Sequence, residues 1–148
     1  MTRSLIRLTV VIALAVAATS ADPFHAAGTD GIREYVVKAL PSLGGTSSRG
    51  NGINDWGPTA GFSNLAVGRR RATLWLYGLT HPIGTLGGTN STIAWSGQNN
   101  RGLVVGIAQT AKLQTRPDGW SCRVFFPGPD NAKYTCLGFA WELGRMKA

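Results

Sequence analysis

The sequence predicts an all-β protein made of propeller-blade-like repeats of short antiparallel strands, incomplete at about two to two and a half units, behind an N-terminal signal peptide. The first observation is a repeat: LGGTSSRGNGINDWGPTAG begins at Leu43 and returns, altered, as LGGTNSTIAWSGQNNRGLVVG from Leu86. The second is composition, because 20 glycines and 7 prolines in 148 residues favour short strands joined by tight turns. The third is the offset of 43 to 45 residues between the copies, which suits a unit of four short strands.

Residues 1–21 have the pattern of a secretory signal peptide. Two arginines precede an apolar run over residues 8–18, and small residues follow it. The apolar run is shorter than the ~20 residues that a membrane-spanning helix needs. We therefore expect cleavage after Ala21, a secreted or periplasmic protein, and a flexible N-terminal segment over residues 22–33.

The charge of the chain is basic with or without this segment. Cleavage of the predicted signal peptide removes Arg3 and Arg7 and leaves 13 basic residues against 7 acidic ones, a net charge of +6. A basic surface favours an anionic polysaccharide or a negatively charged envelope as partner, and export makes nucleic acid unexpected. Three arginines cluster at residues 69–71. Because they follow a glycine and precede a predicted strand, we expect a solvated loop rather than a binding patch.

The repeat region covers residues 34–148. Its first part, EYVVKAL at residues 34–40, predicts a strand, because it is rich in β-forming residues and is followed by a proline. Residues 54–57 predict a turn, in which the asparagine side chain starts the reversal and Gly57 adopts a positive φ. Residues 99–102 repeat that turn in the second copy. The stretch LVVG that follows them predicts a short buried strand.

A third landmark, the strand ATLW at residues 72–75, returns as GFAW at residues 138–141. The two tryptophans, Trp75 and Trp141, recur at equivalent strand positions, which is typical of core residues. Their offset is 66 residues, so the second unit holds 21 to 23 residues more than the first. We place this surplus in an inserted loop at about residues 108–137, a length that is unusual for an unsupported loop in a compact domain.

Both cysteines, Cys122 and Cys136, fall in the inserted loop. Thiols of an exported protein tend to be oxidised and an even count favours pairing, so we predict one disulfide between them. Their separation of 14 residues closes a ring for which chain entropy predicts a stabilisation of roughly 3 kcal/mol. The disulfide is therefore expected to staple the inserted loop.

These landmarks resemble the HAF family of extracellular repeat proteins. The unit of that family runs as H-A-F-L-W, a turn glycine, L-G-T-L-G-G, and then G-I-N-D-x-G-x-V-V-G. The matching stretches, in that order, are residues 71–75 and 137–141, residues 41–45 and 84–88, and residues 52–61 and 97–106. Arg71 and Leu137 stand in place of the family's histidine, and Thr73 and Ala140 alter the interior of the first element. The resemblance implies export and β repeats, and it implies no activity.

The mature chain offers little for catalysis or metal binding, since it contains only His25, His81 and seven scattered carboxylates. His81 has no partner at triad or ligand spacing, and we expect a surface histidine. Asp55 lies in an oxygen-rich turn, yet the turn lacks the further oxygens that calcium needs, and the second copy has Asn100 there. We therefore predict no catalytic, cofactor or metal site, and no enzyme.

Two of the five tryptophans are candidates for stacking on a ligand such as a sugar. Trp56 lies in a turn and has no aromatic equivalent in the second copy, and Trp120 lies beside the stapled loop. Packing in the protein interior is the alternative for each. The triplet Asn90–Thr92 also fits the N-glycosylation pattern.

The sequence therefore favours an exported, non-enzymatic β-repeat protein that acts as a binding or surface scaffold. A carbohydrate-binding module is the alternative, and a secreted hydrolase is the third interpretation. From Glu34 to Ala148 the chain holds 115 residues. Without the surplus of 21 to 23 residues this is little more than two units of about 45, whereas a closed propeller needs about four blades. We expect that the chain does not close a propeller alone. It is then a truncated member of a longer family, which we prefer, or a subunit that completes its sheets by self-association.

Overall fold

The computed structural model describes residues 36–115 and 120–148, without the side chains of Trp120 and Ser121. The predicted signal peptide, the predicted flexible segment and His25 lie outside the described residues. Residues 37–148 form one compact unit. Within the described ranges, no helix is both long and apolar enough to cross a membrane.

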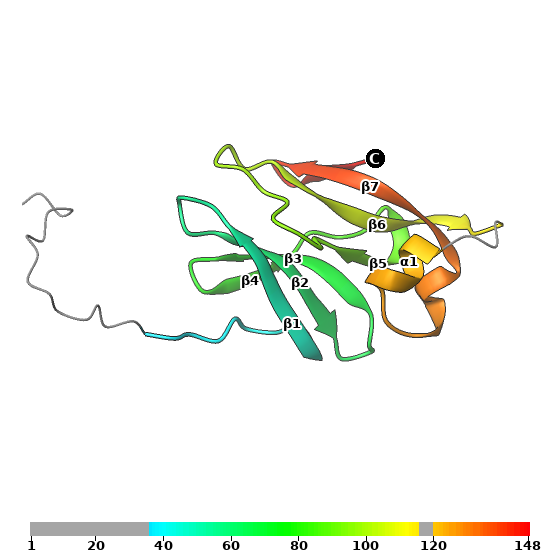
Figure 1. The fold of residues 1–148 in the computed structure, drawn as a ribbon, viewed down its shortest axis with the longest axis horizontal. Helices are drawn as coiled ribbons and strands as arrows, with labels where there is room; N and C mark the ends of the chain where they lie inside the picture. The colour runs from blue at the N-terminus through cyan, green and yellow to red at the C-terminus, as the bar shows by residue number, and fades with distance from the viewer. Residues whose placement is uncertain (1–35, 116–119) are drawn as a thin grey trace, which may run out of the picture. The chain divides into compact units, whose positions relative to one another are not determined.

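The compact unit consists of two four-stranded antiparallel sheets, and each sheet is an up-and-down meander (Figure 1). The first contains, in spatial order, β1 (Gly44–Ile53), β2 (Thr59–Leu65), β3 (Arg70–Leu76) and β4 (Leu79–Pro82). The second contains β5 (Gly87–Thr92), β6 (Val104–Leu113), β7 (Tyr134–Glu142) and β8 (Arg145–Lys147). Between β6 and β7 the chain forms α1 (Trp120–Phe125) and a 3-10 turn (Pro129–Ala132). The prediction of a fold built from short antiparallel strands is confirmed.

The predicted strands lie at equivalent places in the two sheets, with one exception. Residues 72–75 lie in β3, residues 138–141 in β7, and most of residues 103–106 in β6. The strand predicted over residues 34–40 is wrong for the part described, because residues 36–40 have no secondary structure and are exposed. By the repeat offset they correspond to β4, which forms only by pairing with the strand before it, β3. Within the described residues, no strand precedes them to pair with.

Both sheets have a glycine at the same position of their second strand, because the backbone of the neighbouring strand lies very close to it. A side chain at Gly61 of β2 would collide with the carbonyl oxygen of Arg49 in β1. A side chain at Gly106, the equivalent position in β6, would collide with the carbonyl oxygen of Thr92 in β5. Only a residue without a Cβ atom fits between these strands in either sheet.

The two predicted turns form with the same hydrogen bonds. The side-chain oxygen of Asn54 accepts from the backbone N–H of Trp56 at 3.1 Å, and its carbonyl oxygen accepts from Gly57 at 3.0 Å. Asn99 makes the same two bonds in the second copy, at 2.9 and 3.4 Å. The glycines that close the turns have φ angles of 91° and 85°, in the left-handed region that glycine tolerates. The prediction of both turns is confirmed.

The core lies between the two sheets, where β3 packs against β5. It consists of buried apolar side chains from both sheets: Ala60, Ala72, Leu74, Ile93, Val104, Ala108 and Phe139. Trp75 is 3% exposed on the opposite face of β3, and its indole N–H donates to the carbonyl oxygen of Pro41 at 2.8 Å. Trp141, its repeat equivalent, is half-buried and packs against the core. Both tryptophans therefore pack as their strand positions predict.

The inserted loop is shorter than predicted, because its two ends belong to strands. Of residues 108–137, the first six continue β6 and the last four begin β7. The cause is pairing between these two strands, which continues as far as Leu113 and Tyr134. The predicted disulfide between Cys122 and Cys136 is present and joins α1 to β7, with the two Cα atoms 5.9 Å apart.

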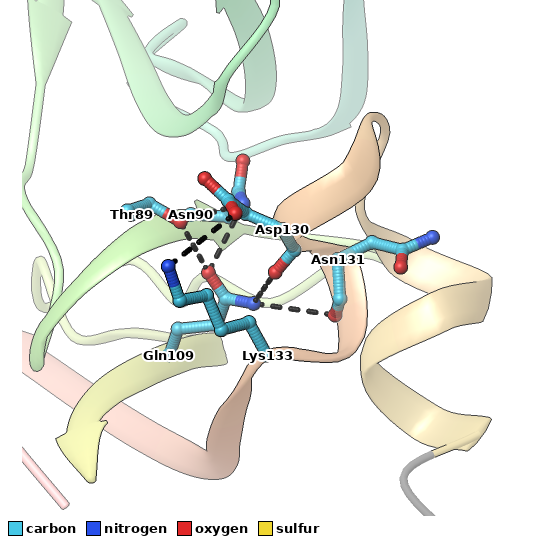
Figure 2. Close-up of polar contacts among 6 residues, drawn as sticks. All are labelled: Thr89, Asn90, Gln109, Asp130, Asn131 and Lys133. Atoms are coloured by element: carbon cyan, nitrogen blue, oxygen red, sulfur yellow. Dashed lines mark hydrogen bonds and ion pairs between the residues drawn. The ribbon is translucent and has the colours of Figure 1, made fainter. Parts of the chain in front are cut away.

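A buried amide also holds the insertion against the second sheet. Gln109 of β6 is fully buried, and its side-chain nitrogen donates to the carbonyl oxygens of Asp130 at 2.9 Å and Asn131 at 3.2 Å (Figure 2). Its side-chain oxygen accepts from the Thr89 hydroxyl at 2.8 Å and from the Asn90 amide at 3.0 Å. One side chain therefore connects β5, β6 and the 3-10 turn.

Candidate functional site

Trp56 projects from the turn between β1 and β2 and is 73% exposed. Its indole N–H donates to the carbonyl oxygen of Asn100 at 3.2 Å, which orients the ring. The residue also borders a hollow of about 460 Å³, which we call the aromatic hollow. Because most of the side chain is exposed and one edge is fixed, the ring is held in place and remains available to a ligand.

Two further aromatic residues line the aromatic hollow. One is Trp75, and the other is Tyr77, which is 94% exposed in the turn between β3 and β4. The remaining lining residues come from the segment before β1 and from the two turns: Lys38, Ala39, Leu40, Pro41, Gly57, Pro58, Thr59 and Gly78. An amphipathic aromatic ring binds an apolar surface and tolerates polar groups at its edge, and Lys38 adds a positive charge. This combination suits a ring-shaped polar ligand such as a sugar.

Trp95 is an exposed tryptophan that sequence reasoning missed. It lies in the connection between β5 and β6 and makes an edge-to-face contact with Phe125 of α1, with ring centroids 5.2 Å apart. It borders a second hollow, of about 490 Å³, together with Val105. The available signal was the repeat itself, because Trp95 lies between Leu86 and Gly97, where the second copy is two residues longer than the first copy between Leu43 and Gly52. Trp120, the other predicted stacking residue, begins α1, and its side chain lies outside the described residues.

The arginine cluster is not the solvated loop that we predicted. Arg70 and Arg71 belong to β3 and are half-buried, and only Arg69 is exposed. The guanidinium of Arg70 donates to the carbonyl oxygen of Phe125 at 2.8 Å, and that of Arg71 donates to the carbonyl oxygen of Thr89. Burial lowers the pKa of both arginines, and the charge of Arg69 lowers the pKa of Arg71 further. Carbonyl groups from distant parts of the sequence accept the hydrogen bonds that water would accept from an exposed arginine. These two arginines therefore connect separate elements of the fold.

Asp55 joins the two repeated turns to each other. Its carboxylate accepts from the side-chain amide of Asn100 at 2.6 Å, and its backbone N–H donates to the side-chain oxygen of Asn100 at 3.1 Å. In the part of the chain that the structure describes, no three His, Cys, Asp or Glu residues are grouped so as to hold a metal ion. His81 lies exposed in β4, paired with Leu74 of β3. Neither residue is part of a cluster of titratable groups in these ranges.

The predicted glycosylation triplet is inaccessible in the folded chain. Asn90 is buried, and its side-chain oxygen accepts from the backbone N–H of Arg70 at 2.8 Å. Its amide nitrogen donates to Gln109 and to Thr89 (Figure 2). A glycan on this nitrogen would replace one of its two N–H groups, and its attachment would require the buried side chain to reach the surface.

Comparison with protein-family models, with curated protein sequences and with solved structures finds no match for the chain. The repeat architecture and the aromatic hollow therefore carry the functional interpretation.

Proposed function

We propose that the chain is an exported, non-enzymatic scaffold of propeller-type β repeats, similar to HAF repeat proteins. The observation that carries the proposal is that two successive copies of the repeat form the same four-stranded meander. Blades of four antiparallel strands are the units of β-propellers. Loops on such a rigid scaffold are frequent binding sites. The Cys122–Cys136 disulfide is compatible with an oxidising compartment outside the cytoplasm.

The chemistry of the described surface favours binding over catalysis. A general base must lie within hydrogen-bonding reach of the proton that it abstracts, and it is commonly oriented by a second polar group. Three carboxylates lie on different elements: Asp55 in the β1–β2 turn, Asp130 in the 3-10 turn and Glu142 at the end of β7. Asp55 is already bonded to Asn100, and Asp130 lies 4.0 Å from Lys133. A hydrolase would require a site assembled from these separate groups or from His81.

Turnover measurements test the non-enzymatic part of the proposal directly. The protein is expected to release no product from chromogenic glycoside or ester substrates. Hydrolysis that is abolished by His81→Ala, or by substitution of one of the described carboxylates, would contradict it. A residual rate that is unchanged by these substitutions would indicate a contaminating enzyme rather than this chain.

Carbohydrate binding is the second candidate function, and the aromatic hollow favours it. Trp56 and Tyr77 expose most of their side chains beside one hollow, and Lys38 lines the same hollow. The exposed Trp56 ring, which is held by its bond to Asn100, suits stacking on the apolar face of a sugar, since the ring loses little conformational freedom on binding. The cationic lysine favours an acidic polysaccharide over a neutral one.

Affinity measurements with acidic and neutral polysaccharides test the aromatic hollow. Trp56→Ala is expected to weaken binding about tenfold, as truncation of an aromatic anchor commonly does. Trp95→Ala is the matched control, because Trp95 is also largely exposed but borders the second hollow. Equal losses in the two variants, or unchanged binding by Trp56→Ala, would exclude the aromatic hollow as the binding site.

A further inference from the structure

The two sheets pack with non-equivalent faces in contact. The face of the second sheet that is equivalent to the covered face of the first sheet therefore points away from the first sheet. Strands β2 and β6 align with an offset of 45 residues, and β3 and β7 align with an offset of 66. Three buried apolar side chains lie on the face of the first sheet that meets the second: Ala60, Ala72 and Leu74. The second sheet meets them with its opposite face, where Val104, Ala108 and Phe139 are buried.

The counterpart on the second sheet is uncovered. It consists of Val105, Gly138 and Ala140, which we call the open face. All three residues are exposed, Val105 at 47%, and they line the second hollow together with Trp95. The equivalent residues of the first sheet are only 0 to 4% exposed. Both sets are apolar, so the difference in exposure arises because a sheet covers the first set, whereas no described strand covers the second.

The two repeated turns also stack in one direction, with the side chains of the first turn bonded to the backbone of the second. The side-chain amide of Asn54 donates to the carbonyl oxygen of Asn99 at 3.3 Å, and the indole of Trp56 donates to that of Asn100 at 3.2 Å. The equivalent donors on the second turn are the side-chain amide of Asn99 and the guanidinium of Arg101. Within the described residues, neither of these groups has an acceptor. The stack of turns is therefore open at the same end as the sheets.

The opposite end of the molecule has the matching surface. In the second sheet, Trp141 borders a hollow with Ile83, and Ile83 also packs against the core between the sheets. In the first sheet, Trp75 borders the aromatic hollow with Leu40, which is the equivalent of Ile83 at an offset of 43. Leu40 is exposed. Leu40 therefore holds the position from which Ile83 packs into the core between the two sheets, but within the described residues no second sheet packs against it.

We propose that the open face binds a second copy of this chain head to tail, with the Leu40 end of one copy laid over Val105 of the other. Within the chain, Trp56 of the first turn bonds to Asn100 of the second. Arg101 is the equivalent of Trp56 and Asp55 is the equivalent of Asn100, so the same packing between copies brings Arg101 of one copy to Asp55 of the next. A second copy is the occupant because the chain itself supplies the required sheet face and a carboxylate for the arginine. A head-to-tail contact leaves a free surface at each end, so it produces a ring or a filament. Leu40 also lines the aromatic hollow, so a second copy and a sugar compete for that surface, and the assembly needs no sugar.

Sedimentation analysis of the protein purified from an exporting host tests this assembly. The wild-type protein is expected to show a concentration-dependent mass above that of the monomer. Val105→Lys blocks the open face and Leu40→Lys blocks the opposite end, and each is expected to weaken association roughly tenfold or more. Val67→Lys is the matched control, because Val67 is exposed in the turn between β2 and β3, and this variant is expected to associate like the wild type.

Mixing the two blocked variants distinguishes head-to-tail binding from a two-fold dimer in which both copies use the same surface. Each variant keeps the surface that the other has lost, so an equimolar mixture is expected to form a dimer that does not grow further. This recovery also shows that both variants are folded. Ala140→Glu, on the same face, replaces Val105→Lys if that variant does not fold. A monomeric wild type at every concentration, a Val105→Lys variant that associates normally, or a mixture of folded variants that stays monomeric would overturn the proposal.

Discussion

Replacement of Gln109 by leucine is expected to destabilise the protein strongly, although leucine occupies a similar volume. The native side chain is fully buried and makes four hydrogen bonds. Leucine makes none of them. The side-chain nitrogen of Asn90 then keeps only its bond to Thr89, and the carbonyl oxygens of Asp130 and Asn131 lose their donor. The substitution therefore leaves several polar groups without a partner in the protein interior.

The magnitude follows from the burial of the groups that lose a partner. A buried polar group left unpaired costs about 1–3 kcal/mol. Asn90 is buried, whereas Asp130 and Asn131 are half-buried, so that water partly compensates their carbonyl groups. We therefore expect a loss of about 3 kcal/mol in the free energy of unfolding. Because 1 kcal/mol corresponds to about 4–8 °C in a domain of roughly this size, Tm is expected to fall by at least about 10 °C.

Thermal and urea unfolding, followed by circular dichroism, measure this loss. Asn131→Ala is the control, because Asn131 bonds to Gln109 through its carbonyl oxygen and its side chain points away (Figure 2). That variant is expected to unfold within about 0.5 kcal/mol of the wild type. A Gln109→Leu protein as stable as the wild type would refute the reasoning. An Asn131→Ala protein as unstable as Gln109→Leu would show that the side chains of the turn matter more than its carbonyl groups.

Two further predictions concern the disulfide and the N-terminus. The double substitution Cys122→Ala, Cys136→Ala is expected to cost roughly 3 kcal/mol and to accelerate amide exchange in α1 and the 3-10 turn more than in β1–β4, and equal acceleration in the first sheet would contradict this. The exported protein is expected to begin at Asp22, which N-terminal sequencing measures, and retention of Met1 in the exported form would contradict a cleaved signal peptide.

Sequence reasoning succeeded where residues close in the chain decide the structure. The turn at residues 54–57 needs only an asparagine that accepts from a backbone N–H two residues on and a glycine that tolerates a positive φ. The strand at residues 72–75 follows from its β-forming residues, and its return at residues 138–141 identified a second sheet of the same kind. For the aromatic hollow, the sequence identified Trp56 as a candidate but did not indicate that Tyr77 and Lys38 line the same hollow.

Sequence reasoning failed where a distant partner decides the structure. Arg70 is half-buried because the carbonyl oxygen of Phe125, 55 residues away, accepts its hydrogen bond. Residues 36–40 have β-forming side chains, yet a strand also needs a neighbour to pair with, and none is present in the described residues. Gln109 carried no signal in the sequence, since a lone glutamine in a strand predicts neither burial nor a contact with the insertion.

By itself, the sequence determined the repeat, the short strands, the turns and the pairing of two cysteines, because these depend on local backbone preferences and on composition. Only the tertiary structure decided which surfaces are covered. Ala72 and Gly138 are equivalent by sequence, both small and apolar, but one is fully buried and the other is exposed. Burial depends on what packs against a strand face, and two strands with the same pattern have different surroundings when a sheet covers only one of them.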